Sequence, residues 1–460
     1  MIRKNLKEIE IYSGGYDLLE KFYERSIEGV SNDTRNISKG NLYVPIIGEN
    51  FDGHDFLNLA IENGAVASLW QKDIPLPEQD FPLIIVNDTL LALQSLSKNY
   101  RDSLGDIKII GITGSNGKTS TKDIMDGIIS SRFKTQKTRG NLNNHIGVPL
   151  TLLDLQEDTE VAIVEMGTDG FGQIETITKL ASPDIAMITN IGPSHLDLLK
   201  TTENVARAKF EILDGLKKDG LFIYNNDDLV LKEVIKEYNI FQKTLTFGKS
   251  DFSDFRVELI KEGIDGIDFM VFEGSESHKL HIPMLGRHNI YNAAVSIATA
   301  RELGLNYEDI QKGLYNINAT EMRNEIIKTQ NFDILNDAYK SNPDSLLAAL
   351  DTLYSIEGYK HKAVVLGDMV DLGDHVVSLH KEIGPKIDNN KIDKIFTIGS
   401  LAEHIGKSAL VNFKAESIYH SETKDQLVQT ILENIEKDTL LLVKASRSVA
   451  LEDVIARLVQ

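Results

Sequence analysis

The sequence contains no cysteine, which excludes disulfide bonds, thiolate zinc sites and thiol nucleophiles. This absence fits a reducing compartment, so we expect a cytoplasmic protein. No stretch of about 18 uncharged apolar residues occurs, and the first residues lack the apolar run of a secretory signal, so we expect no membrane insertion. A basic surface is also missing, because the formal net charge is −20. We therefore expect no nucleic-acid partner.

The chain has 460 residues, of which only 10 are prolines, and this length suggests about three domains without a long linker. Short apolar runs alternate with helical patterns, which predicts an α/β fold with parallel sheets. We expect a small α/β N-terminal domain (1–104) and a central P-loop-type domain with a mostly parallel sheet covered by helices (105–320). A C-terminal Rossmann-like α/β domain (321–460) follows.

A glycine loop follows the β-branched strand expected at residues 107–112. A helix expected from Thr119 to about Ser130 comes next, and this order is typical of a phosphate-binding loop for ATP. The candidate ATP-binding residues of the loop are Gly114, Ser115, Asn116, Gly117, Lys118, Thr119 and Ser120. The usual first glycine is replaced by Ile112, so a surface turn of small residues is the alternative. The flanking strand and helix favour phosphate binding.

Glu165 ends the apolar strand expected at residues 161–165. A phosphate-binding enzyme needs a carboxylate at such a place to hold Mg²⁺ together with the hydroxyl group of Thr119. A glutamate at a strand end is by itself more often solvated, and only the neighbouring loop favours the metal-binding interpretation.

His195 and Lys209 suggest a second metal site. His195 follows the strand expected at 185–189, where ligands of open α/β sheets gather, although a lone histidine is more often structural. Lys209 lies inside the apolar stripe of a helix expected over residues 203–216. Two interpretations stay open: a buried stem whose ammonium reaches the helix edge, or a lysine carbamylated by CO₂ that binds Mg²⁺ as a carboxylate. Carbamylation needs the neutral amine, which burial favours.

Several segments together resemble the Mur ligases, which build the peptide stem of bacterial cell-wall precursors. They are TGSNGKT (113–119), Glu165, NIGPSH (190–195), ARAK (206–209) and GRHNIYNA (286–293). Further stretches resemble the members of the family that add a dipeptide: GNLNNHIGVPL (140–150), DAYKSNP (337–343), LGDMVDLG (366–373) with His380, and VKASR (443–447). The sequence departs from the family pattern at His145, Pro193, Glu321, Lys340 and Ala445. We expect these departures to affect fine nucleotide contacts and catalytic efficiency, not the class of reaction.

The resemblance implies an ATP-dependent ligase that joins D-alanyl-D-alanine to UDP-N-acetylmuramoyl-tripeptide through an acyl phosphate. It implies that Lys118, Glu165, His195 and Lys209 are catalytic. One Mg²⁺ would be held by Thr119 and Glu165, and a second by His195 and carbamylated Lys209. It places Asn289 and Asn292 near adenine, and Arg323 and Asp337 near the ribose and phosphates.

The substrate contacts also follow from the resemblance. Thr34 and Arg35 would hold the UDP group, since an arginine fork suits a diphosphate; without the resemblance an exposed turn is the simpler interpretation. Asn143 and Asn144 would face the muramoyl-peptide, and Asp344 and Ser345 the dipeptide. We expect a monomer whose third domain closes onto the second.

Three alternatives compete with this interpretation. The related ligase that adds the third amino acid shares the metal and nucleotide motifs, but the segments 140–150 and 366–373 argue against it. A folate polyglutamate ligase would lack the UDP-binding motif. A nucleotide-dependent switch would turn ATP over slowly and would not depend on a dipeptide; Lys209 and the third α/β unit favour a ligase.

Overall fold

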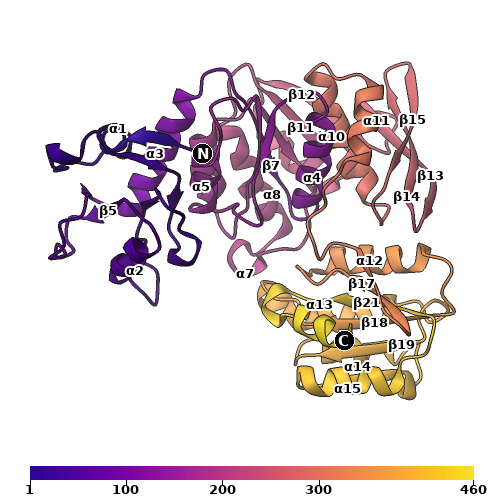
Figure 1. Ribbon diagram of the computed structural model, residues 1–460. Helices are drawn as coiled ribbons and strands as arrows, with labels where there is room; N and C mark the ends of the chain where they lie inside the picture. The colour runs from indigo at the N-terminus through magenta and orange to yellow at the C-terminus, as the bar shows by residue number, and fades with distance from the viewer. Residues whose placement is uncertain (460) are drawn as a thin grey trace.

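The computed structural model describes residues 1–459. Figure 1 shows the N-terminal part (indigo) beside the central part, and the C-terminal part (orange to yellow) below it. Each of the three larger sheets is built from only one of these parts. The expected α/β class with three units is confirmed, while the domain boundaries at 104 and 320 stay predictions.

The N-terminal part contains a four-stranded parallel sheet in the order β3-β4-β5-β6, and a separate pair β1-β2. Helices α1 and α3 pack against one another and contribute apolar side chains to the same core as this sheet. The elements are β1 (Arg3–Asn5), α1 (Leu6–Ser13), β2 (Ser26–Glu28), β3 (Val30–Ser31), β4 (Leu42–Tyr43), α2 (Leu57–Glu62), β5 (Ala67–Gln71), β6 (Leu83–Val86) and α3 (Thr89–Ser103).

The central part is a nine-stranded sheet in the order β15-β14-β13-β12-β11-β10-β7-β9-β8. Neighbours from β8 to β13 run parallel, and β14 and β15 extend the sheet as antiparallel hairpins. The strands are β7 (Lys108–Thr113), β8 (Thr135–Lys137), β9 (Val161–Glu165), β10 (Ile185–Ile188), β11 (Leu221–Asn225), β12 (Lys243–Gly248), β13 (Phe255–Gly263), β14 (Gly266–Glu273) and β15 (Glu276–Ile282). The continuous apolar runs in β9 and β10 are buried on both faces, as parallel strands covered by helices must be.

Two groups of helices cover the central sheet. Helices α4 (Lys118–Ile129), α10 (Asn289–Glu302) and α11 (Tyr307–Tyr315) supply one apolar cluster, and α5 (Gly147–Leu153), α6 (Gln173–Ala181), α8 (Thr202–Phe210) and α9 (Leu229–Val234) supply the other. The helix expected over 203–216 is shorter, because α8 ends at Phe210 and a 3-10 turn over Glu211–Asp214 follows. The Glu211 carboxylate accepts the N–H groups of Gly172 and Glu175 and thereby caps α6.

The C-terminal part is a six-stranded sheet in the order β16-β17-β21-β18-β19-β20, parallel except for β16. Its strands are β16 (Glu325–Lys328), β17 (Phe332–Asn336), β18 (His361–Gly367), β19 (Lys394–Ile398), β20 (Ile418–Ser421) and β21 (Thr439–Lys444). Helices α12 (Pro343–Ser355), α13 (Val376–Ile383) and α14 (Glu403–Ala409) pack on one face, and α15 (Lys424–Asn434) and α16 (Glu452–Leu458) on the other. Over residues 1–459, no helix has the length and apolar character needed to cross a membrane.

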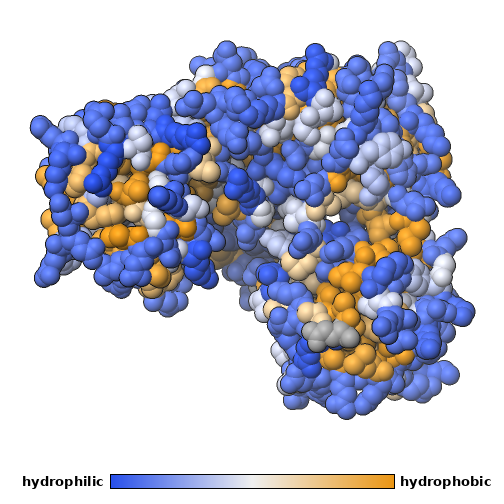
Figure 2. All heavy atoms as spheres, viewed as in Figure 1, coloured by the Kyte–Doolittle hydropathy of each residue, from blue (hydrophilic) through white to orange (hydrophobic). Residues whose placement is uncertain are grey.

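The third domain is docked against the central one. The Leu196 N–H, at the start of α7 (Leu196–Leu199), donates to the Asp371 carbonyl at 3.0 Å, and Leu379 of α13 packs against the apolar cluster around α7 and α8. Figure 1 shows α12 and α13 on the side of the third domain that faces the central one. Figure 2 shows a mostly hydrophilic face with apolar side chains gathered over the N-terminal and C-terminal domains. The N-terminal domain contacts the central one through α3, which packs on α5 and α6, and Leu153 of α5 belongs to its core.

Candidate active site between the central and third domains

A cavity of about 600 Å³ lies between the central and third domains, which is within the usual range for small-molecule sites. The central domain lines it with the glycine loop, Glu165 and Asn292. The third domain lines it with Arg323, Asp337, Tyr339, Lys340, Asp344, Ser345 and Lys444. The structure therefore brings most of the expected nucleotide-binding residues together from both sides of one cleft.

The glycine loop joins β7 to α4 at the carboxyl edge of the sheet. Gly114 has φ +153°, and a Cβ atom there would lie 1.8 Å from Thr189 Oγ1. Gly117 has φ +80°, and a Cβ atom there would lie 2.5 Å from Asn292 Oδ1. The loop is held by Asn190. The Ser115 N–H donates to the Asn190 carbonyl and the Asn116 N–H to the Asn190 side-chain oxygen, both at 2.9 Å. Its conformation is thus set before a ligand binds.

Lys118 is the first residue of α4, and its ammonium donates to the Gly114 carbonyl at 2.5 Å. Burial, followed by the charge of Lys340, lowers the Lys118 pKa to about 8. A cation held in such surroundings gains from an anionic partner, which a phosphate group supplies.

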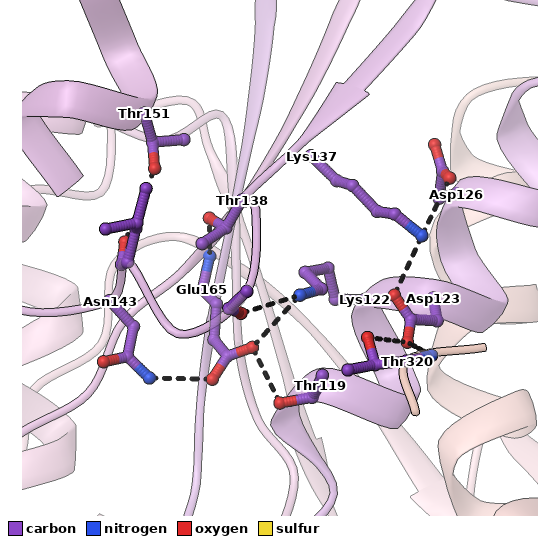
Figure 3. Close-up of polar contacts among 12 residues, drawn as sticks. Thr119, Lys122, Asp123, Asp126, Lys137, Thr138, Asn143, Thr151, Glu165 and Thr320 are labelled. Carbon is purple, nitrogen blue, oxygen red and sulfur yellow. Dashed lines mark hydrogen bonds and ion pairs between the residues drawn. The ribbon is translucent and has the colours of Figure 1, made fainter. Parts of the chain in front are cut away.

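Glu165, at the end of β9, is the centre of a buried polar cluster (Figure 3). Its carboxylate accepts the Thr119 hydroxyl at 3.0 Å and the Asn143 side-chain amide at 2.8 Å. Its backbone N–H donates to Thr138 Oγ1 at 2.9 Å. The ammonium of Lys122 lies 3.7 Å from Glu165 Oε2, and the side chains of this pair are 1% and 3% exposed. The expected pairing of Thr119 with Glu165 is thus present as geometry.

Arg323 and Asn342 join the two walls of the cleft. Arg323 Nη2 donates to Thr119 Oγ1 at 3.0 Å, and Asn342 Nδ2 donates to Asn116 Oδ1 at 2.9 Å. Between the two domains, Thr320 is held against α4, because Asp123 accepts both its N–H (2.8 Å) and its hydroxyl group (2.7 Å) (Figure 3). The chain then turns through left-handed conformations at residues 322 and 324. The wall of the third domain therefore starts directly beside the phosphate loop.

His195, Lys209 and Lys340 lie at one end of the cleft. His195 Nδ1 is 3.1 Å from Asp169 Oδ1, and its Nε2 is 3.2 Å from the Lys340 ammonium. Burial and the charges of Lys340, Lys209 and Lys118 lower the His195 pKa to about 3, so the imidazole is neutral. Lys209 is 2% exposed, and burial together with the charges of Lys118 and Lys340 lowers its pKa well below the usual value. Among the described residues, no group of three or more His, Cys, Asp and Glu is arranged to hold a metal.

Besides Gly114, His195 and Lys209, four more of the expected residues do not line the cavity: Thr34, Arg35, Asn144 and Asn289. Thr34 and Arg35 are on the N-terminal domain, where the Arg35 side chain is 86% exposed and pairs with Asp33. The Asn144 side-chain oxygen accepts the N–H groups of residues 146 and 147 and caps α5. Asn289 lies behind Asn292 and accepts its side-chain amide at 2.8 Å. Asn144 and Asn289 thus have structural hydrogen bonds rather than a place on the cavity wall.

Two buried lysines received no role from the sequence, although Lys444 lies in the segment VKASR (443–447). Lys122 lies under Glu165. Lys444, at the end of β21 and 1% exposed, donates to Asp337 Oδ2 at 2.5 Å and to the Lys340 carbonyl at 3.0 Å. A lysine that ends an otherwise apolar strand was the available signal for Lys444. Lys122 gave no such signal, because it follows the polar first turn of α4.

Comparisons with known proteins agree with this geometry. Three profiles match in order along the chain: the Mur ligase family catalytic domain over residues 26–101, the Mur ligase middle domain over 112–300, and the Mur ligase glutamate ligase domain over 322–447. The UDP-N-acetylmuramoyl-tripeptide–D-alanyl-D-alanine ligase of Bacillus subtilis (strain 168) is 41% identical over 100% of this chain and 99% of its own length. The enzyme of the same name from Escherichia coli (strain K12) is 32% identical over 94% of each chain.

Solved structures show the same arrangement of the chain. A crystal structure of MurF from Acinetobacter baumannii superposes with a TM-score of 0.88 at 27% identity, covering 100% of this chain and 99% of its own. The MurF ligase from Thermotoga maritima, solved in complex with ADP, superposes with a TM-score of 0.80 at 24% identity over 94% and 97% of the two chains. The phosphate loop, the cleft between the second and third domains and this similarity along the whole length lead to one conclusion. The chain belongs to the Mur ligase family.

Proposed function

We propose that this protein joins D-alanyl-D-alanine to UDP-N-acetylmuramoyl-tripeptide at the expense of ATP, a step of peptidoglycan precursor synthesis. The observation that carries the proposal is the cleft itself: a phosphate loop on one wall and Arg323, Asp337 and Lys444 on the other, in a chain 41% identical over its full length to a ligase of that name. ATP and the substrates are small molecules, and both cleft walls come from a single chain, so we propose a monomer working in the cytoplasm.

The reaction needs an activated carboxylate, because a free carboxylate is a poor electrophile. The γ-phosphoryl group passes to the terminal carboxylate of the tripeptide, and the amine of the dipeptide then displaces phosphate from the acyl phosphate. The chain contributes positioning and charge. We expect Lys118 and the N–H groups of the loop beyond Asn116 to bind the phosphates, and Arg323 to add positive charge from the third domain. Asp337 is held by Lys444 at the cavity edge.

Thr119 and Glu165 fit one Mg²⁺. Their oxygen atoms lie 3.0 Å apart on the cavity wall, next to the place for the phosphates, and hard oxygen ligands are the ones Mg²⁺ prefers. Bound Mg²⁺ would neutralise phosphate charge. Asn143, which donates to Glu165, would keep the carboxylate oriented.

We also propose that Lys209 is carbamylated, as an extension of the resemblance. Its burial and lowered pKa favour the neutral amine that reacts with CO₂. Supply of ¹³C-bicarbonate followed by carbon NMR should give a carbamate signal in the wild type that is missing in Lys209→Met; equal spectra would refute it. A second Mg²⁺ on His195 does not fit this arrangement, because the Lys340 ammonium lies 3.2 Å from His195 Nε2.

We propose that the remaining substrate groups bind at the cleft and on the N-terminal domain. Asp344 and Ser345, at the start of α12, line the cavity and are available to the dipeptide. Thr34 and Arg35 would bind the UDP group, because the exposed Arg35 side chain can give up its ion pair with Asp33 and bind a diphosphate instead.

Phosphate release tests the function directly. We expect release from ATP that requires both UDP-N-acetylmuramoyl-tripeptide and D-alanyl-D-alanine, with a product mass equal to the two substrates less water. Release that ignores the dipeptide would overturn the proposal and favour a nucleotide-dependent switch. The related ligase that adds the third amino acid is tested with UDP-N-acetylmuramoyl-dipeptide in place of the tripeptide and a single amino acid in place of the dipeptide.

A further inference from the structure

Lys340 stands between the nucleotide cavity and His195. Lys340 lines the cavity, whereas His195 and Lys209 do not. The Lys340 ammonium lies 3.2 Å from His195 Nε2. The group that meets a ligand at this end of the cleft is therefore the ammonium of the third domain.

His195 is oriented to accept a hydrogen bond from a cation. Its Nδ1 lies 3.1 Å from the Asp169 carboxylate, and its side chain is 13% exposed. An imidazole that donates from Nδ1 to a carboxylate presents the lone pair of Nε2 on the opposite side. In this chain the lone pair faces the Lys340 ammonium, where a metal bound to His195 would otherwise lie.

The backbone of Lys340 is held on both sides. Its carbonyl accepts the buried Lys444 ammonium at 3.0 Å, and Lys444 is paired with Asp337. Two residues farther on, Asn342 donates to Asn116 in the phosphate loop at 2.9 Å. These bonds fix the distance between the Lys340 backbone and the loop, while the side chain of Lys340 stays exposed toward the cavity.

The Lys340 ammonium has no carboxylate within ion-pair distance among residues 1–459. Desolvation lowers the pKa of Lys340, and the charges of Asp371 and Asp169, which lie farther away, oppose this shift. Lys118 and Arg323 line the same cavity, and the charge of Lys340 acts on Lys118 while that of Arg323 acts on Lys340. An ammonium on a cavity wall that has no carboxylate within ion-pair distance is complementary to an anion that enters the cavity.

We propose that Lys340 binds the γ-phosphoryl group of ATP directly, so that an ammonium resting on His195 supplies the positive charge expected from a second metal ion. This rests on the proposed function. During transfer, a carboxylate oxygen of the tripeptide bonds to the γ-phosphorus, and the bond from that phosphorus to the bridging oxygen breaks, with its electron pair leaving on ADP. Lys340 stays protonated and donates hydrogen bonds to the equatorial oxygens throughout.

Nucleotide titration separates a γ-phosphate contact from a general effect on the cleft. The variant Lys340→Met keeps the length of the side chain and removes its charge. Lys407→Met, at an exposed position of α14 in the same domain, is the matched control. With Mg²⁺ present, we expect Lys340→Met to bind the β,γ-imido analogue of ATP about ten- to a hundredfold more weakly, and ADP within about threefold of the wild type. Lys407→Met should match the wild type with both. Equal loss of both nucleotides, or loss of neither, would overturn the proposal.

Metal counting is a second readout. With the imido analogue bound, Mn²⁺ titrated by electron paramagnetic resonance should give one bound ion per wild-type chain; two would refute the replacement of a metal by Lys340. Neither measurement uses the peptide substrates, so failure of the ligase assay leaves the outcome for Lys340 readable, and failure here leaves the ligase activity standing.

Discussion

The change Glu165→Ala tests the cluster in Figure 3 most directly, because the carboxylate serves three donors at once. Thr119 and Asn143 lose an acceptor, but both line the cavity, where water can replace it. Lys122 is in a different situation. Its side chain is 1% exposed, and its other contact is the Gly140 carbonyl at 3.4 Å. The variant therefore leaves a buried ammonium without a counter-charge.

The size of the effect follows from that ammonium. Removing one member of a buried ion pair costs about 3–5 kcal/mol. The 3.7 Å separation from Lys122 is long, and Glu165 borders the cavity, so we take the lower end, about 3 kcal/mol of unfolding free energy. For a domain of roughly 200 residues this lowers the melting temperature by about 6–12 °C.

A double-mutant cycle separates this cause from loss of the other hydrogen bonds. We expect Lys122→Met alone to be milder than Glu165→Ala, because the carboxylate keeps Thr119 and Asn143 as donors. We expect the double variant to be about 2 kcal/mol more stable than the sum of the single losses predicts. Melting followed by circular dichroism without nucleotide measures all four proteins.

Two results would refute this reasoning. A Glu165→Ala protein that melts within about 2 °C of the wild type would show that Lys122 finds another partner. Additive losses in the double variant would show that the two side chains do not stabilise one another, whatever their separation.

Three further changes have defined outcomes. Gly114→Ala should abolish ADP binding measured by calorimetry, because its Cβ atom would lie 1.8 Å from Thr189 Oγ1. The control is Gly105→Ala, where φ is +72° but the surrounding space is open. It should cost only about 1 kcal/mol of stability and keep the affinity for ADP. Asn342→Ala should lose about 1 kcal/mol of stability by removing an N-cap. It should also enlarge the radius of gyration in X-ray scattering, because the hydrogen bond to Asn116 is lost. The control Asn306→Ala removes an N-cap that has no interdomain bond, so it should change stability only. His380 is buried and accepts the Met369 N–H, and burial lowers its pKa from 6.5. The unfolded chain therefore binds more protons, and the free energy of unfolding should fall as the pH drops below about 6.5. In urea titrations His380→Gln should lose this contribution to the pH dependence of stability, and an unchanged pH dependence would refute the argument.

The parts of the site that could be predicted depend on local patterns. The glycine loop needs only the strand before it and the helix after it, and Glu165 ends a strand that proves to be the neighbour of β7, so Thr119 and Glu165 meet at one edge of the sheet. The three α/β units were predictable for the same reason, because each alternation of strand and helix is visible over short stretches of chain.

The parts that could not be predicted depend on contacts between distant segments. Asn116 and Asn342 meet only because the third domain docks on the second, and no periodicity marks either residue. The apolar stripe that includes Lys209 continues past Phe210, so the pattern cannot reveal that Glu211 leaves the helix to cap α6. Asn289 matched a family motif, but its buried amide supports Asn292 instead of facing the cavity.

The attachment of Thr320 to Asp123 has a mechanical consequence. A rotation of the third domain about this point would have a short lever arm at Arg323 and a longer one at α13, which meets α7 and α8. A small angular opening would barely disturb the groups beside the phosphate loop while clearing a wide passage at the distal end. Bulky substrates could then be exchanged there without the nucleotide end coming apart.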